Sequence, residues 1–153
     1  MRKVALLITA GVAASATALV LAVGGSAQDT SGRTFQLLEG KPFHFKEVHT
    51  PPKGLSPGDA AVSRAALKDS SGKAAGSYHS HCLITKAGAH PVALCTHSFF
   101  LRDGRISAAG GVNLDRSQLV PVVGGTGAYE GAQGTVLIEA GRKKTVLTFN
   151  LKP

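Results

Sequence analysis

The chain has 153 residues, a length typical of one domain, and a formal net charge of +8. Its lysines and arginines are scattered along the sequence, and only residues 141–144 (GRKK) cluster them. Because no aromatic residues alternate with these charges to stack bases, we exclude nucleic acid as a partner.

Residues 1–27 have the layout of a secretory signal peptide. A basic start leads into a long apolar stretch, which ends in the small residues Gly-Ser-Ala. This layout predicts cleavage near Ala27 and a secreted, extracytoplasmic protein with no membrane contact. An uncleaved anchor is the alternative, because residues 4–23 are long enough to span hydrocarbon. The glycines and serine at the end of the apolar run, and the polar residues after it, favour cleavage.

Residues 28–40 begin with the polar run QDTSGR and are predicted to be a flexible leader, so the folded domain is expected to span residues 41–153. In this domain, short segments rich in β-branched and aromatic residues alternate polar with apolar side chains and end at Gly, Pro, Asp or Asn. Several such strands predict an all-β barrel or sandwich. The segments are residues 43–49, 77–85, 92–101, 135–140 and 145–151.

The first of these segments, FHFKEVH, places a carboxylate on an apolar face. Phe43, Phe45, Glu47 and His49 alternate with other side chains, so they share one face of the strand. If this face is inward, Glu47 is a poorly solvated acid and a candidate for acid–base chemistry. The alternative is that Glu47 lies at the strand end, reaches solvent and pairs with a lysine.

The two cysteines lie in the next two segments, which the sequence KAGAH connects. An antiparallel register centred on this connection places Cys82 opposite Cys95, at a separation that a disulfide can bridge. In an oxidising compartment we expect the two to be bonded. Two buried free thiols are the alternative.

A second hairpin follows. Asp103-Gly104 is a strong signal for a two-residue turn, so Leu101 is expected opposite Ile106. Together the two registers divide the side chains between two faces. The more apolar face, assigned to the lumen, carries Tyr78, Ser80, Cys82, Ile84, Cys95, His97, Phe99, Leu101, Ile106 and Ala108. The other face includes His79, His81, Thr85, Thr96 and Ser98.

The glycine-rich stretch VVGGTGAYEGAQG raises the question of a phosphate-binding loop. A dinucleotide fingerprint has a third glycine and leads into a helix, whereas here Glu130 stands at the third place and a strand follows. Gly124, Gly125 and Gly127 are therefore predicted to be structural. We expect them in a tight turn entering a strand, at positions that need a positive φ or a close backbone approach.

The histidines of the HSH sequence are the candidates for metal binding. His79 and His81 share one strand face, with His97 nearby in the sequence. The expected register puts His97 on the opposite face, and Thr85 and Lys86 stand where a glutamate ligand would be needed. We therefore expect no metal site and surface roles for the histidines of HSH.

The glycine stretch and its surroundings resemble one family. A GGTG turn, an aromatic residue and a Gly-x-x-Gly pair, preceded by FFLRDGRISAAGG and followed by TFNLKP, are similar to the allene oxide cyclase and dirigent-protein superfamily. The resemblance implies a closed antiparallel barrel of about eight strands with an apolar lumen, commonly assembled as a homotrimer. It implies chemistry on a hydrophobic small molecule without a metal or cofactor.

Site residues carry over from this family in part. The sequence KEVHTPP is similar to a cyclase strand in which a glutamate precedes an asparagine, and HCLIT to a strand with an inward cysteine. The resemblance thus implies Glu47 as the catalytic residue, while His49 departs from the family's asparagine. Two functions follow: a cofactor-free cyclase or isomerase, or a noncatalytic or dirigent-type barrel that orients a ligand. The predicted ligand-binding residues are Phe43, Phe45, His49, Tyr78, His97 and Phe99.

Overall fold

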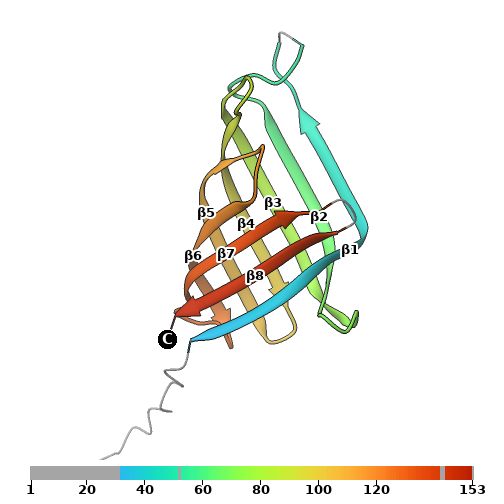
Figure 1. Cartoon of the computed structure of the whole chain (residues 1–153), viewed down its shortest axis with the longest axis vertical. Helices are drawn as coiled ribbons and strands as arrows, with labels where there is room; N and C mark the ends of the chain where they lie inside the picture. Colours follow the sequence, from blue (N-terminus) through green and yellow to red (C-terminus); the bar gives the residue numbers. More distant parts are fainter. Residues whose placement is uncertain (1–31, 52, 142–143, 153) are drawn as a thin grey trace, which may run out of the picture.

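Eight antiparallel strands close into a barrel in sequence order (Figure 1). The computed structural model describes residues 32–51, 53–141 and 144–152. The predicted all-β barrel is confirmed, and within these ranges no helix is long and apolar enough to cross a membrane. The predicted signal peptide lies outside the described residues. The strands are β1 (Arg33–Val48), β2 (Ala60–Lys68), β3 (Ala74–Lys86), β4 (Val92–Leu101), β5 (Gly104–Asn113), β6 (Gln118–Gly127), β7 (Gln133–Ala140) and β8 (Thr145–Lys152).

Strand β1 begins earlier than predicted. Residues 33–40, expected to be part of a flexible leader, belong to the strand, and residues 33–38 pair with β8 to close the barrel. Phe35 stacks on Phe149 of β8 with ring centroids 4.7 Å apart, and Leu37 is buried. The polar residues that precede this strand predict a flexible leader, so the start of the strand was not recognised from its alternating pattern.

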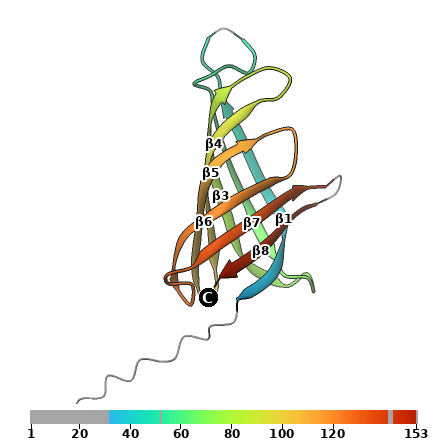
Figure 2. The ribbon, with the colours of Figure 1, turned by 60° about the vertical axis from the view of Figure 1, so that its left-hand side comes forward.

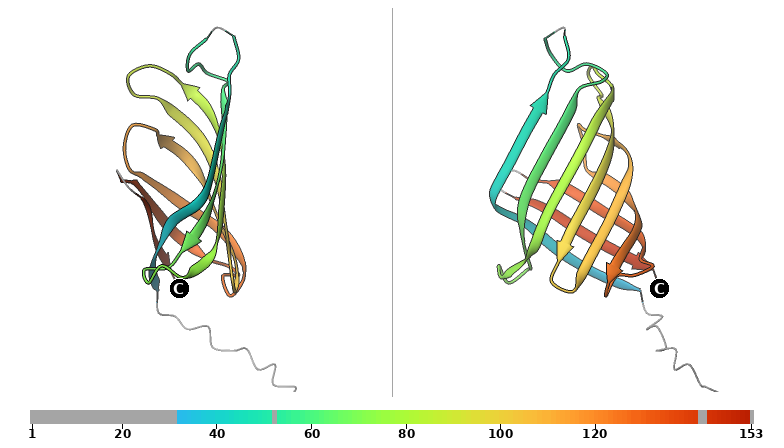
Figure 3. Two further views of the ribbon diagram at one scale, coloured as in Figure 1. Left: turned by 90° about the vertical axis from the view of Figure 1, so that its right-hand side faces the viewer. Right: turned by 180° about the vertical axis from the view of Figure 1, so that it is seen from behind.

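The barrel is closed at one end and open at the other. Above a register shift between Gly40 and Phe43, β1 pairs with β2 alone, and β5 pairs with β6 only over its first residues, 104–108. Strands β1 to β5 therefore form a tall wall that rises past strands β6 to β8 (Figures 1 and 3). The β1–β2 connection lies at the far end of the tall wall (Figure 2).

The closed half of the barrel is filled with side chains. Phe99 and Phe149 are both fully buried and meet edge to face, with ring centroids 4.9 Å apart. The cavity next to this packing lies toward the open end. The other largest fully buried apolar side chains are Leu67, Ile106, Leu147, Val120 and Val136.

The expected division of side chains between two faces is confirmed. Cys82 pairs with Cys95 across β3 and β4, and their sulfur atoms form a disulfide. All ten side chains assigned to the lumen are buried or partly buried, whereas His79 and His81 are exposed on the outer face.

The β4–β5 register differs from the prediction by two residues. Leu101 pairs with Gly104, and Phe99 with Ile106, so the turn consists of Arg102 and Asp103. Gly104 is needed in the strand because a Cβ atom there would lie 2.0 Å from the carbonyl oxygen of Thr126. Since side chains alternate, a slip of two residues leaves each one on its predicted face.

The glycine stretch is the crowded end of β6 and not a turn that enters a strand. Gly124 and Gly125 lie within β6, and Gly127 ends it with a φ of 63°. A Cβ atom on Gly125 would lie 2.2 Å from the carbonyl oxygen of Tyr129 and 2.7 Å from that of Arg105. The chain turns only after these glycines and then enters β7, as the sequence predicted.

Candidate functional site

The open half of the lumen contains a cavity of about 440 Å³, a size common among small-molecule sites. Phe43 and Phe45 of β1, Ile84 of β3 and Ile138 of β7 contribute apolar lining. Polar groups lie at two levels: a charged set at the rim and a neutral pair at the floor.

Strand register brings most of the predicted site residues to this cavity. Tyr78 pairs across β3 and β4 with Phe99, and one step toward the open end Ser80 pairs with His97. On β1, Phe45 pairs with Ser63 of β2, and Ser63 pairs in turn with Ser80. Layers of lumen-facing side chains are thus stacked along the barrel.

Phe99 is the exception among the predicted ligand-binding residues. Its side chain is fully buried and is not part of the cavity lining. The Phe99 ring lies below Tyr78 with centroids 5.1 Å apart and contacts Phe149 on its other side. Phe99 therefore supports the cavity floor from the packed core.

A buried carboxylate, Asp59, organises the rim. It accepts hydrogen bonds from His49 Nδ1 at 3.0 Å and from the backbone N–H groups of Thr50 and Ser56 at 2.7 and 2.9 Å. These hydrogen bonds, above all the one from His49, hold the pKa of Asp59 well below its ordinary range. The same bond raises the pKa of His49.

Asp59 was missed in the sequence because its role depends on the path of the β1–β2 connection. Ser56 and Asp59 have the local spacing of a turn in which a side chain accepts a backbone N–H. That signal predicts a loop, but it does not show that the loop brings Asp59 against His49 at the mouth of a barrel.

Glu47 lines the cavity but is more exposed than predicted. Its side chain is 46% exposed, and its Oε2 lies 3.2 Å from His49 Nε2. The expectation of a poorly solvated acid is wrong, because this part of β1 has a neighbouring strand on one side only. The partner of Glu47 is a histidine that is itself held by Asp59, and not a lysine.

A further acid of the lumen, Glu39, is partly buried. It continues the inward alternation of Phe35 and Leu37 on β1 and lines the cavity below Glu47. Burial raises the pKa of Glu39, partly offset by a hydrogen bond with Thr145. Glu39 was missed because the folded domain was expected to begin at residue 41.

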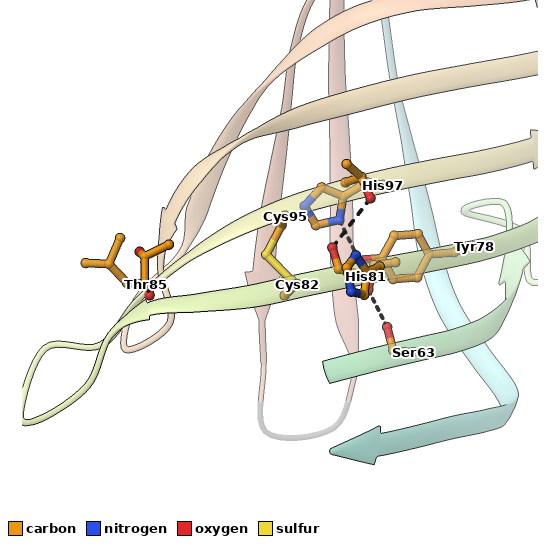
Figure 4. The surroundings of a disulfide bond; sticks show 10 residues. Ser63, Tyr78, His81, Cys82, Thr85, Cys95 and His97 are labelled. Atoms are coloured by element: carbon orange, nitrogen blue, oxygen red, sulfur yellow. Dashed lines mark hydrogen bonds between the residues drawn. A yellow bond between two sulfur atoms is a disulfide. The ribbon is translucent and has the colours of Figure 1, made fainter. Parts of the chain in front are cut away.

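The cavity floor carries a neutral polar pair, Tyr78 and His97 (Figure 4). The Tyr78 hydroxyl lies 2.8 Å from His97 Nδ1, and both side chains are buried. Burial raises the pKa of Tyr78 to about 12 and lowers that of His97 to about 4. Both groups are therefore uncharged near neutral pH, which suits an apolar lumen.

The disulfide lies one layer above this pair (Figure 4). Cys82 contributes to the cavity lining, and because it is bonded to Cys95 it offers no free thiol. A disulfide is typical of proteins that mature outside the cytoplasm.

The histidines of the HSH sequence do not converge with His97. His79 and His81 lie on the outer face of β3, and His97 lies in the lumen. Across residues 32–51, 53–141 and 144–152, no group of three or more His, Cys, Asp or Glu side chains is placed to hold a metal ion.

Comparisons with known proteins agree with this architecture. Residues 41–149, well over half of the chain, match the model of the allene oxide cyclase barrel like domain. No curated protein sequence matches the chain.

Solved structures with the same fold include the following three. Pyocyanin demethylase has a TM-score of 0.67 at 18% identity, covering 78% of this chain and 99% of its own. AbnU, an exo-specific intermolecular Diels-Alderase, has a TM-score of 0.65 at 18% identity, covering 80% and 99%. The pterocarpan synthase dirigent protein PsPTS1 has a TM-score of 0.57 at 13% identity, covering 79% and 92%. Such low identities show a common fold and no more.

Proposed function

Since the chain belongs to the allene oxide cyclase barrel like domain family, we propose that it is an exported, cofactor-free cyclase or isomerase. Its substrate is a hydrophobic small molecule bound in the open half of the lumen. The observation that carries this proposal is the meeting of an apolar cavity with a carboxylate, Glu47, that lines it and is fixed by a histidine.

The cavity and the carboxylate have different tasks in this proposal. The apolar walls hold the substrate in a compact, reactive conformation, which lowers the entropic part of the barrier. Glu47 stabilises developing positive charge or accepts a proton. Phe43 and Phe45 flank the substrate beside Glu47, and the neutral Tyr78–His97 pair offers hydrogen bonds at the floor.

Export is part of the proposal. The apolar N-terminal segment predicts a signal peptide cleaved near Ala27, and the disulfide suits an oxidising compartment. We also propose a homotrimer. Apolar side chains on the outer face, among them Leu83 and Leu94 at 41% and 56% exposure, would be covered by neighbouring copies. Light scattering on the exported protein measures the number of copies.

A noncatalytic barrel of dirigent type is the second candidate. The 46% exposure of the Glu47 side chain favours it, because a solvated carboxylate is a weaker electrostatic catalyst than a shielded one. In that case the lumen only orients its ligand, and another reagent carries out the reaction of that ligand.

The proposal is tested by identifying what the lumen holds. Protein purified from its export pathway is extracted and analysed by mass spectrometry, next to Ala61→Trp, which fills the cavity beside Glu47. Thr96→Trp, on the outer face of β4, is the matched control. We expect a small apolar molecule with the wild type and with Thr96→Trp, and none with Ala61→Trp. A molecule retained equally by all three proteins would place binding outside the lumen.

A further inference from the structure

Three side chains at the rim form a chain of proton-sharing contacts. His49 lies between two carboxylates, with Nδ1 at 3.0 Å from Asp59 Oδ2 and Nε2 at 3.2 Å from Glu47 Oε2. Asp59, more than Glu47, raises the pKa of the His49 ring, and both carboxylates contribute through a hydrogen bond and through their charge. Both ring nitrogens can donate at once only when the imidazole is protonated.

The two carboxylates have different environments and therefore different roles. Asp59 is 1% exposed and accepts bonds from the backbone and hydroxyl groups of Thr50 and Ser56, so it stays ionised and fixed. Glu47 and His49 are about half exposed and line the cavity, so both can reach a ligand. One carboxylate holds the histidine in place, and the other shares a proton with it.

We propose that Glu47 and His49 form a proton shuttle that isomerises a hydrophobic carbonyl compound, with Asp59 as the positioning residue. This inference rests on the proposed function, because it requires a ligand in the lumen. Glu47 takes a proton from the carbon next to the carbonyl group while the Nε2–H of protonated His49 donates to the carbonyl oxygen. The C–H bond breaks, an O–H bond forms, and no electrons leave the substrate.

The reverse step resets the site. After the first step, Glu47 carries a proton and His49 is neutral, and their facing atoms Oε2 and Nε2 are 3.2 Å apart. In a carbonyl substrate with a C=C bond beside the acidic carbon, the product of the first step is a dienol. Glu47 returns its proton to the far carbon of the dienol while His49 Nε2 takes back the hydroxyl proton: a C–H bond forms, the O–H bond breaks, the double bond moves, and ionised Glu47 and protonated His49 are restored.

The first test measures the protonation of His49 directly. Imidazole resonances are followed by NMR during a pH titration of the full protein, Asp59→Asn and, as a matched control, Asp103→Asn in the exposed β4–β5 turn. We expect His49 to titrate above the ordinary histidine value in the wild type and the control, and about one pH unit or more lower in Asp59→Asn. A wild-type value at or below the ordinary one, or no change in Asp59→Asn, overturns the inference.

The second test measures proton transfer with 2-octanone as the probe. Exchange of its α-hydrogens in D₂O is followed by mass spectrometry, and its binding by displacement of Nile red from the lumen. We expect exchange above the buffer rate, at least tenfold slower in Asp59→Asn and lost in Glu47→Gln, with Glu139→Gln on the outer face of β7 unchanged. The high-pH limb of the exchange rate should move to lower pH in Asp59→Asn.

The outcomes separate the inference from the proposed function. Binding of 2-octanone without faster exchange overturns the proton shuttle and leaves the lumen as a ligand site. Absence of binding to the lumen counts against the proposed function itself, and the shuttle falls with it.

Discussion

The closed and open halves of the barrel contain the same kinds of residue, which stabilise the fold in the closed half and line the cavity in the open half. Phe99 and Phe149 in the closed half are fully buried, whereas Phe43 and Phe45 around the cavity are 54% and 56% exposed. Two histidines show a related contrast within the cavity: burial lowers the pKa of His97 at its floor, and the hydrogen bond to Asp59 raises that of His49 at its rim. The residues that stabilise the fold and the residues proposed for chemistry thus lie in different layers of the barrel. Mutations should therefore affect stability and ligand binding separately.

The largest expected effect lies at the crowded end of β6. Gly125→Val would place side-chain atoms against the carbonyl oxygens of Tyr129 and Arg105, so we expect the protein not to fold, with a cost of about 3 kcal/mol or more. Gly111→Val is the control, because a Cβ atom there meets only a side-chain methyl of Leu94 at 3.9 Å. Circular dichroism and the yield of soluble protein measure the folding of both variants. A well-folded Gly125→Val protein that lacks only ligand binding would show that this glycine serves the ligand.

Matched phenylalanine truncations compare the two halves directly. Phe149→Ala removes a fully buried ring and should lower the free energy of unfolding by about 3–5 kcal/mol. Phe45→Ala removes a half-exposed ring from the cavity wall and should change it by about 0.5 kcal/mol or less, while weakening ligand binding. Chemical denaturation measures both values. Equal costs would mean that the open half is also part of the stabilising core.

The disulfide should have an intermediate effect. It joins β3 and β4 across a sequence separation of 13 residues, and replacing both cysteines by alanine should lower the free energy of unfolding by about 2–3 kcal/mol. Thermal unfolding of the double variant and of the oxidised wild type provides the comparison. Two readily alkylated thiols in the wild type purified without reductant would show that the bond does not form.

The rim should respond to pH while the closed half does not. Asp59 has a lowered pKa, so its contribution is present above the ordinary aspartate pKa and is lost as the pH falls well below it. His49 has a raised pKa, so its contribution is present below the ordinary histidine pKa and is lost as the pH rises through its folded value. Amide hydrogen exchange at Thr50 and Ser56 should therefore accelerate at both extremes, relative to amides of β8. A uniform response along the chain would mean that the rim is not a separate unit.

The strand faces could be predicted from the sequence because local rules determine them. A short symmetric connection placed Cys82 opposite Cys95, and the two-residue error at Gly104 did not change any face because side chains alternate. That error arose because Gly104 is required where β5 lies close to the backbone of the neighbouring strand β6, and not in the turn. Alternation therefore survives even where the exact register does not.

The polar part of the site was harder to predict because it depends on contacts distant in sequence. Glu39 lies in a segment whose polar start predicts a leader, although Phe35 and Leu37 before it already show the inward alternation of β1. The solvation of Glu47 depends on which strands flank β1, and the role of Asp59 depends on the path of a loop. Neither property is encoded in the residues around them.

The central claim is that the open half of the lumen carries out chemistry through Glu47. The most direct test compares wild type, Glu47→Gln and Glu139→Gln, measuring affinity and turnover with the molecule recovered from the lumen. We expect Glu47→Gln to keep the fold and the affinity and to lose about a hundredfold or more in turnover, while Glu139→Gln matches the wild type. An unchanged rate in Glu47→Gln would contradict the account and leave a barrel that only holds its ligand.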